Sequence, residues 1–207
     1  KDDAIIFKIG EIQKLEDLKP DLFIVVAYKI LPKLLLSIPT MGAINLHSSL
    51  LPKYRGAAPI QRSILNHDKI TGISTFLIEP KVDTGKILMQ KECEISDNDN
   101  YGSLSLKLSN IGAQLIVESI EKYSRGDISP ITQDEKLVTL APKIKKEEHI
   151  IDWNQDLTTI DAQVKAFSPY PGAYTMIDGK RLKIFEAKMT RGINYKEVGK
   201  IINLSKT

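Results

Sequence analysis

Two short apolar runs limit the folds that are open to this chain. Leu22–Ala27 is a continuous apolar run of the kind that forms a parallel strand buried on both faces, and Ala43–Leu46 is the second run. The residues between them, Tyr28–Gly42, are numerous enough for a right-handed crossover between parallel strands. The spacing predicts a βαβ unit within an α/β fold, with a Rossmann-like, mostly parallel twisted sheet flanked by helices.

The rest of the chain alternates between helical and strand patterns. Apolar residues at helical spacing predict helices at Ile12–Leu18, Pro32–Ser37, Ile60–Asn66, Ser103–Tyr123 and Thr158–Phe167. Strands are expected at Ala4–Ile9, Gly72–Ile78 and Ile87–Ile95, and a hairpin around Asp178-Gly179 at Ala173–Ile177 and Leu182–Ala187. Gly192–Gly199 resembles a linker and Lys200–Leu204 the start of a strand. We therefore predict a core at residues 1–190 and a linker with the first strand of a further domain at 191–207.

Composition excludes several classes of protein. The 207 residues suit one domain and the edge of a second, and 42% hydrophobic with 27% charged residues is ordinary for a soluble protein. A net charge of +3 allows a nucleic-acid partner without arguing for one. Cys93 is the only cysteine, which rules out an internal disulfide, argues against a cysteine-based zinc site and fits a reducing compartment. No apolar run reaches the roughly 20 residues that a membrane span needs, and no signal peptide is visible.

Polar side chains gather where the second apolar run ends. Asn45 and His47 are two residues apart on a strand, so that their side chains point to the same face. One brings an amide and the other an imidazole that can carry charge near neutral pH. The chain then becomes irregular at Pro52, Gly56 and Pro59. Ligands of open α/β sheets bind at such strand ends, although a core histidine and a turn-forming asparagine would give the same pattern.

A second polar segment favours a ligand-binding site over a core histidine and a turn-forming asparagine. Val82-Asp83-Thr84-Gly85-Lys86-Ile87 lies between two predicted strands. Together with Asn45–Gly56, which has the pattern N-x-H-x-S-L-L-P-x-Y-R-G, it resembles the signature of the folate-dependent formyltransferases. The continuation Gly56–Arg62 and the segment Leu140–Trp153 are similar to the branch of that family that acts on methionyl-tRNA.

The resemblance implies transfer of a formyl group from 10-formyltetrahydrofolate to the amino group of methionyl initiator tRNA, through a tetrahedral oxyanion intermediate and without a metal. Such a reaction must stabilise an oxyanion, accept a proton and deliver one. The family pattern implies that Asn45 donates to the oxyanion, that His47 adds charge and relays protons, and that Asp83 orients His47 and favours its charged form. The residues that match the family's folate-binding loop are Ser49, Leu50, Leu51 and Pro52.

The family pattern also extends beyond both ends of this sequence. It has strands before the first run and a small β-barrel domain after the linker, and Lys1-Asp2-Asp3 does not look like a native beginning. We therefore expect the amino-terminal strands and most of the β-barrel domain to be missing. The resemblance further implies a monomeric, cytoplasmic protein whose partners are initiator methionyl-tRNA and the folate, with no membrane.

Several alternatives stay open on the sequence alone. Other enzymes that use 10-formyltetrahydrofolate act on a small amine or on water, and they share the Asn, His and Asp pattern. A non-catalytic fragment that binds folate or tRNA is a further alternative. Arg55 and Arg62 fit tRNA phosphate, the folate tail or plain surface charge equally well. The basic residues Lys143, Lys145 and Lys146 are interspersed with acids, which is typical of a solvated face.

We predict that His47→Ala leaves the fold intact and lowers formyl transfer by about 10²–10³-fold, because one group that stabilises an oxyanion is removed. Circular dichroism and turnover of the variant and the parent protein check this. Full activity in a folded variant would contradict the assignment.

Overall fold

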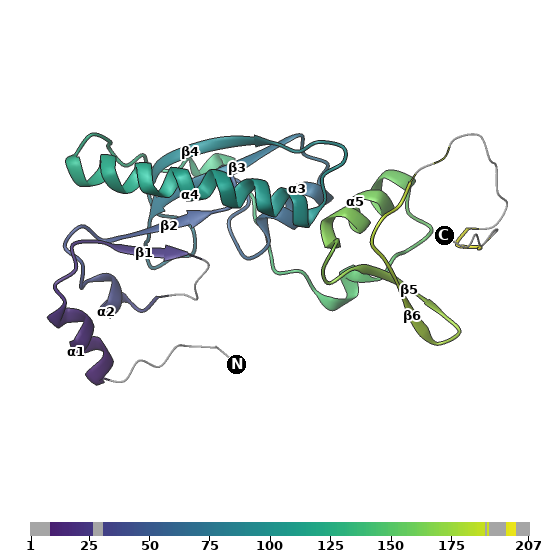
Figure 1. The fold of residues 1–207 in the computed structure, drawn as a ribbon, viewed down its shortest axis with the longest axis horizontal. Helices are drawn as coiled ribbons and strands as arrows, with labels where there is room; N and C mark the ends of the chain where they lie inside the picture. Colours follow the sequence, from purple (N-terminus) through teal and green to yellow (C-terminus); the bar gives the residue numbers. More distant parts are fainter. Residues whose placement is uncertain (1–8, 27–30, 189, 191–197, 202–207) are drawn as a thin grey trace.

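The computed structural model describes residues 9–26, 31–188, 190 and 198–201. Its helices and strands alternate from α1 to β3, β4 and the long helix α4 follow, and the last two strands form a hairpin (Figure 1). The helices are α1 (Ile9–Asp17), α2 (Lys33–Leu36), α3 (Pro59–Leu65), α4 (Tyr101–Arg125) and α5 (Leu157–Phe167), with 3-10 turns at η1 (Glu135–Leu137) and η2 (Lys146–His149). The strands are β1 (Phe23–Val26), β2 (Ala43–His47), β3 (Ile70–Leu77), β4 (Ile87–Glu94), β5 (Ala173–Ile177) and β6 (Lys180–Ile184).

The main sheet has four strands in the order β1-β2-β3-β4. β1 and β2 run parallel with α2 between them along the chain, as the spacing of the two apolar runs predicts. The expectation of a mostly parallel sheet is wrong, because β2 pairs antiparallel with β3, and β3 pairs antiparallel with β4. Residues 78–86 connect β3 to β4, and so short a segment joins adjacent strands in opposite directions, whereas a parallel crossover needs about a dozen residues or more.

The long helix α4 packs along β3 and β4 (Figure 1). It begins where the Asn100 side chain accepts a hydrogen bond from the Ser103 N–H, and it ends at Gly126, whose φ of 77° is left-handed. Its buried residues recur every three or four positions, at Leu104, Leu108, Gly112, Leu115 and Ser119. Gly112 allows a close approach to the sheet, since a Cβ atom there would lie 3.1 Å from Leu46 Cδ1 on β2.

The carboxy-terminal elements pack on the same core. α5 contacts α3 and α4, and one cluster of buried side chains joins the three helices through Ile64, Leu104 and Val164. The predicted hairpin is confirmed as β5 and β6, with the second strand beginning earlier, at Lys180. Asp178 and Gly179 both have positive φ, which the tight turn requires. This part of the molecule lies at the end away from α1 (Figure 1).

Two predicted strands cannot be compared with the structure. Residues 4–8 of the first and 202–204 of the second lie outside the described residues, and so does most of the linker at 192–199. The division of the chain between residues 190 and 191 therefore stays a prediction.

Neither a membrane helix nor a metal cluster is found among the described residues. No helix in this part of the chain is both long and apolar enough to cross a membrane. Within the same residues, no three His, Cys, Asp or Glu side chains are placed to hold a metal ion. Cys93 is buried on β4, and burial raises the pKa of its thiol, so that the reactive thiolate form is disfavoured.

The core can be tested with two leucines on the same helix. Leu104 is 0% exposed, whereas Leu106 is 65% exposed. We expect Leu104→Ala to lower the free energy of unfolding by about 2–5 kcal/mol, because it leaves a cavity. Leu106→Ala should change it by roughly 0.5 kcal/mol or less. Urea unfolding measures both, and equal losses would show that α4 does not pack as described.

Candidate active site

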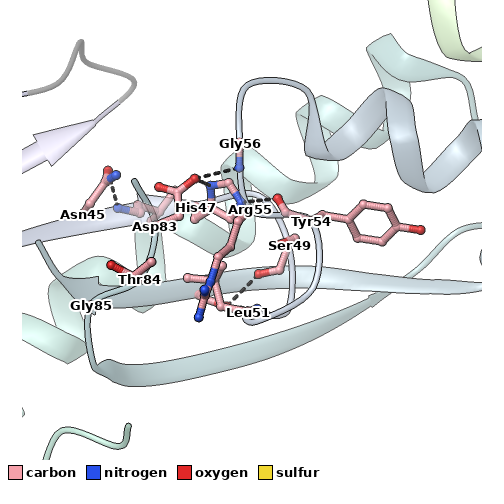
Figure 2. A network of polar contacts seen from close by, with 12 residues as sticks. Asn45, His47, Ser49, Leu51, Tyr54, Arg55, Gly56, Asp83, Thr84 and Gly85 are labelled. Carbon is pink, nitrogen blue, oxygen red and sulfur yellow. Dashed lines mark hydrogen bonds and ion pairs between the residues drawn. The ribbon is translucent and has the colours of Figure 1, made fainter. Parts of the chain in front are cut away.

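His47 ends β2 and is held between a carbonyl group and a carboxylate (Figure 2). Its Nε2 lies 2.8 Å from the carbonyl oxygen of Tyr54, and its Nδ1 lies 3.7 Å from Asp83 Oδ2. A carbonyl oxygen can only accept, so Nε2 must carry the proton of that hydrogen bond. The nitrogen that can gain or lose a proton is therefore Nδ1, which faces Asp83. The ring is only 7% exposed, which is more buried than a position at the end of a strand suggests.

Asp83 belongs to the loop between β3 and β4 and reaches back to the loop after β2. Its Oδ2 atom accepts a hydrogen bond of 2.8 Å from the Gly56 N–H (Figure 2). Asp83 itself has a φ of 53°, a left-handed conformation that is uncommon outside glycine. At Gly85, an added Cβ atom would lie 1.6 Å from the carbonyl oxygen of Leu77, so that the loop can fold in this way only with glycine there.

Asn45 lies two residues before His47 on β2. Its Oδ1 accepts a hydrogen bond of 2.7 Å from the Leu46 N–H, which fixes the direction of the amide. Among the described residues, no hydrogen bond joins Asn45 to His47 or Asp83. The structure thus places the His47 ring 3.7 Å from the Asp83 carboxylate, a contact that becomes an ion pair when the ring is protonated, and leaves Asn45 beside them as a separate polar group (Figure 2).

The loop after β2 is braced by two polar residues of the sheet. Ser74 on β3 donates through Oγ to the carbonyl oxygen of Ser49 at 2.6 Å and accepts from the Leu51 N–H at 2.9 Å. Gln90 on β4 donates through Nε2 to Ser74 Oγ at 2.7 Å and to the Leu51 carbonyl oxygen at 2.9 Å. These hydrogen bonds hold the backbone of the loop, at Ser49 and Leu51, against β3 and β4.

The four residues expected to line a folate differ in burial. Ser49 and Leu51 are buried, whereas Leu50 and Pro52 are half-buried. The Ser49 hydroxyl is used within the loop, since it donates to the carbonyl oxygen of Lys53 at 2.6 Å. Two of the four residues therefore shape the loop and two present surface, and their role in binding stays a prediction.

Arg55 is a buried residue that fastens a distant segment to the site. We call residues 127–145, between α4 and η2, the connector. Arg55 donates through Nε and Nη2 to Gln133 Oε1, at 3.0 and 2.7 Å, and pairs with Glu135 at 2.8 Å. Gln133 donates in turn through Nε2 to the carbonyl oxygens of Asp83, at 2.9 Å, and Gly85, at 2.7 Å. The connector therefore touches the same loop that carries the Asp83 carboxylate.

Arg62 holds the carboxy-terminal end of the connector and the 3-10 turn η2 that follows it. Its Nη1 and Nη2 atoms contact the two carboxylate oxygens of Glu148 at 2.6 and 3.0 Å, and its Nε donates to the Pro142 carbonyl oxygen at 3.2 Å. The hydrogen bond from Arg62 lowers the pKa of the Glu148 carboxyl. The two arginines whose roles the sequence left open are thus engaged within the protein, whereas Lys143, Lys145 and Lys146 are exposed as predicted.

Sequence reasoning missed two features of the site. The carbonyl acceptor of His47 belongs to Tyr54, whose φ of 61° is left-handed and whose hydroxyl donates to Asp68 at 2.6 Å. Burial, together with Asp68, raises the pKa of this tyrosine to about 12, so that it stays a neutral donor. The second is Gln133, which stands in a polar stretch without any local pattern to mark it.

Comparison with known proteins identifies the family. A family model described as formyl transferase matches residues 8–120, which is more than half of the chain, and a model described as formyl transferase, C-terminal domain, matches residues 143–207. The chain belongs to the formyl transferase family. The formyl transferase models leave residues 121–142 between them, and this stretch includes the part of the connector that holds Gln133.

Individual relatives give the same family. The chain is 49% identical over 182 residues to the methionyl-tRNA formyltransferase of Thermodesulfovibrio yellowstonii, covering 87% of this chain and 59% of that protein. It is 47% identical over 178 residues to the methionyl-tRNA formyltransferase of Dictyoglomus thermophilum, covering 86% of this chain and 57% of that protein. The chain therefore spans less than two thirds of the length of these curated relatives.

A solved structure shares the fold. The crystal structure of HypX from Aquifex aeolicus in complex with tetrahydrofolic acid superposes with a TM-score of 0.72 at 22% identity, covering 84% of this chain and 31% of that one. At this identity the likeness supports the formyl transferase fold alone.

The Arg62–Glu148 contact predicts a pH-dependent contribution to stability. Because the folded protein lowers the pKa of Glu148, the contact stabilises the fold above the ordinary glutamate pKa and is lost as the pH falls through the lowered value. Glu148→Gln should lower the free energy of unfolding by about 1 kcal/mol at pH 7, and by less near pH 3.

The matched control is Glu147→Gln, because Glu147 is the preceding residue and is exposed. It should have no such pH dependence in urea unfolding. An equal loss at both pH values in Glu148→Gln would mean that the carboxylate charge contributes nothing.

Proposed function

We propose that this protein transfers a formyl group from 10-formyltetrahydrofolate to the amino group of methionyl initiator tRNA. Membership of the formyl transferase family and 47–49% identity to two methionyl-tRNA formyltransferases support the proposal. The observation that carries it at the level of chemistry is the fixed orientation of His47, with Nε2 on a carbonyl and Nδ1 toward a carboxylate, at the end of a buried strand.

His47 is suited to proton transfer. An amine must be neutral to attack and loses a proton as it forms its new bond. The neutral imidazole has its lone pair on Nδ1, because Nε2–H is committed to the Tyr54 carbonyl oxygen. Once Nδ1 takes a proton, it points a positive N–H at Asp83, whose carboxylate stabilises the imidazolium. Asp83 thereby supports the accepting state without touching the substrate itself.

Asn45 supplies the second function, a donor for developing negative charge. The Leu46 N–H occupies Oδ1 of its amide and therefore directs the NH₂ group away from the backbone. A fixed N–H donor of this kind stabilises an oxyanion, and the imidazolium of His47 on the same strand adds positive charge. Within the proposal, Asn45 and His47 act on the reacting groups, and Asp83 acts on catalysis by positioning His47.

The loop after β2 fits a folate. Its backbone is braced by Ser74 and Gln90, while Leu50 and Pro52 stay half-buried, so that they offer a firm apolar wall. When bound, the folate would supply the formyl group. Ser49 and Leu51 would hold the loop in shape and Leu50 with Pro52 would contact the ligand. No metal enters the proposal, because Asn45 supplies the oxyanion donor and His47 accepts the proton of the attacking amine and returns it to the folate nitrogen that leaves as the C–N bond breaks.

The experiment is a labelled-formyl transfer assay with the full-length protein, in which charged initiator tRNA, an amino sugar and water compete as acceptors. We expect formyl-methionyl-tRNA as the product. Asn45→Asp should lower the rate by about 10²–10³-fold, because it removes the oxyanion donor. The control Asn154→Asp makes the same change at an exposed turn and should keep full activity.

Each other product would overturn the proposal in its own way. A formylated amino sugar alone would assign a small amine as the acceptor, and free formate alone would assign hydrolysis. Folate or tRNA binding without any turnover would leave a binding protein. A monomeric state and a cytoplasmic location stay predictions of the sequence.

A further inference from the structure

We infer that Gln133 of the connector is a positioning residue, which holds the Asp83 carboxylate in place against His47 and Gly56. The inference rests on the proposed function only in assigning a catalytic role to Asp83. The contacts that carry it join three segments that are far apart in the sequence, namely the loop after β2, the loop between β3 and β4, and the connector.

The direction of the Gln133 amide is fixed by its partner. Arg55 is only 6% exposed, and a guanidinium has donors and no acceptor, so that the atom 3.0 Å from Nε and 2.7 Å from Nη2 must be the amide oxygen. The NH₂ group is therefore turned to the loop between β3 and β4, where it donates to the carbonyl oxygens of Asp83 and Gly85. Gln133 is itself only 6% exposed, so that water does not compete for these bonds.

The loop that receives these bonds needs support from outside. Asp83 has a φ of 53°, a conformation that persists only where surrounding contacts fix it. Gln133 donates to the backbone on both sides of Thr84, at residues 83 and 85. These two hydrogen bonds fix the backbone of Asp83 and thereby the direction in which its side chain points.

The connector also holds the partner of the Asp83 carboxylate. The Arg55 N–H donates to the Thr139 carbonyl oxygen at 2.9 Å, and the Ala141 N–H donates to the Arg55 carbonyl oxygen at 2.7 Å. Gly56 follows directly, and a Cβ atom there would lie 2.6 Å from the Ala141 carbonyl oxygen. The connector therefore positions both the donor and the acceptor of the hydrogen bond between the Gly56 N–H and Asp83 Oδ2.

The test compares two glutamines in the full-length protein. Gln133→Glu keeps an acceptor for Arg55 and replaces the two donors by a carboxylate that repels the carbonyl oxygens of Asp83 and Gly85. The control is Gln163→Glu on α5, because Gln163 also donates through Nε2 to two backbone carbonyl oxygens, those of Glu148 and Ile150, at 2.8 and 2.9 Å.

Hydrogen exchange of the Gly56 amide reports on the Asp83 carboxylate without any assay of activity. Gln133→Glu should speed this exchange by about tenfold or more and lower kcat by a similar factor, with the KM for the folate changed by less than about twofold. Gln163→Glu should change neither quantity by more than about twofold. Normal Gly56 exchange in Gln133→Glu would overturn the inference even if the protein proves to catalyse another reaction.

A double variant separates positioning from a general effect on the fold. If Gln133 acts through Asp83, adding Gln133→Glu to Asp83→Asn should lower kcat no further than Asp83→Asn alone. Losses that multiply would assign Gln133 a purely structural role. If Gln133→Glu does not fold, Gln133→Asn replaces it, since the shorter amide cannot span Arg55 and the two carbonyl oxygens. Failure of both variants to fold while Gln163→Glu folds would likewise overturn the inference.

Discussion

The buried guanidinium of Arg55 is the group on which much of this structure depends. A charge removed from water is costly unless it is paired and fully hydrogen-bonded, and Arg55 finds its partners in the connector, 78 and 80 residues further along the chain. That requirement brings Gln133 and Glu135 to the edge of the sheet. The connector, which lacks long helices or strands, thereby acquires a defined path over the loop that follows His47 and the loop that carries Asp83.

Two glycines let backbone segments approach closely at the site. The carbonyl oxygen of Leu77 fills the space that a side chain at position 85 would need, and that of Ala141 fills the space at position 56. Backbones that approach so closely let a main-chain N–H meet the Asp83 carboxylate directly. His47 is fixed by the same means, through a carbonyl group rather than a side chain. The site is thus defined largely by main-chain atoms, with few side chains free to rearrange.

This dependence on the main chain explains what the sequence could and could not predict. The βαβ unit follows from two apolar runs and their spacing, and the hairpin at residues 178 and 179 from turn chemistry, because both are local patterns. The motif also brought Asn45, His47 and Asp83 forward as one group. Every residue has a carbonyl group, however, so that nothing in the sequence identifies Tyr54 as the acceptor of the hydrogen bond from His47. Arg55 and Gln133 are 78 residues apart, and no periodic pattern in the sequence indicates that they pair.

The attachment of the connector has a consequence for how the protein can vary in length. Ile131 pairs with Ile87 of β4, Gln133 and Glu135 hold Arg55, and Ala141 pairs with the backbone of Arg55, so that this part of the chain is anchored repeatedly along its length. One residue inserted between Gln133 and Glu135, which are separated by a single residue, would displace one of them from Arg55 by about 3.3 Å, more than a hydrogen bond tolerates. Residues 128–130, between Asp127, which is bonded to the end of α4, and Ile131, make none of the contacts that fasten the connector to Arg55 or to the loop after β3. A change in the length of the connector should therefore disturb the site least before Ile131 and most between Gln133 and Glu135.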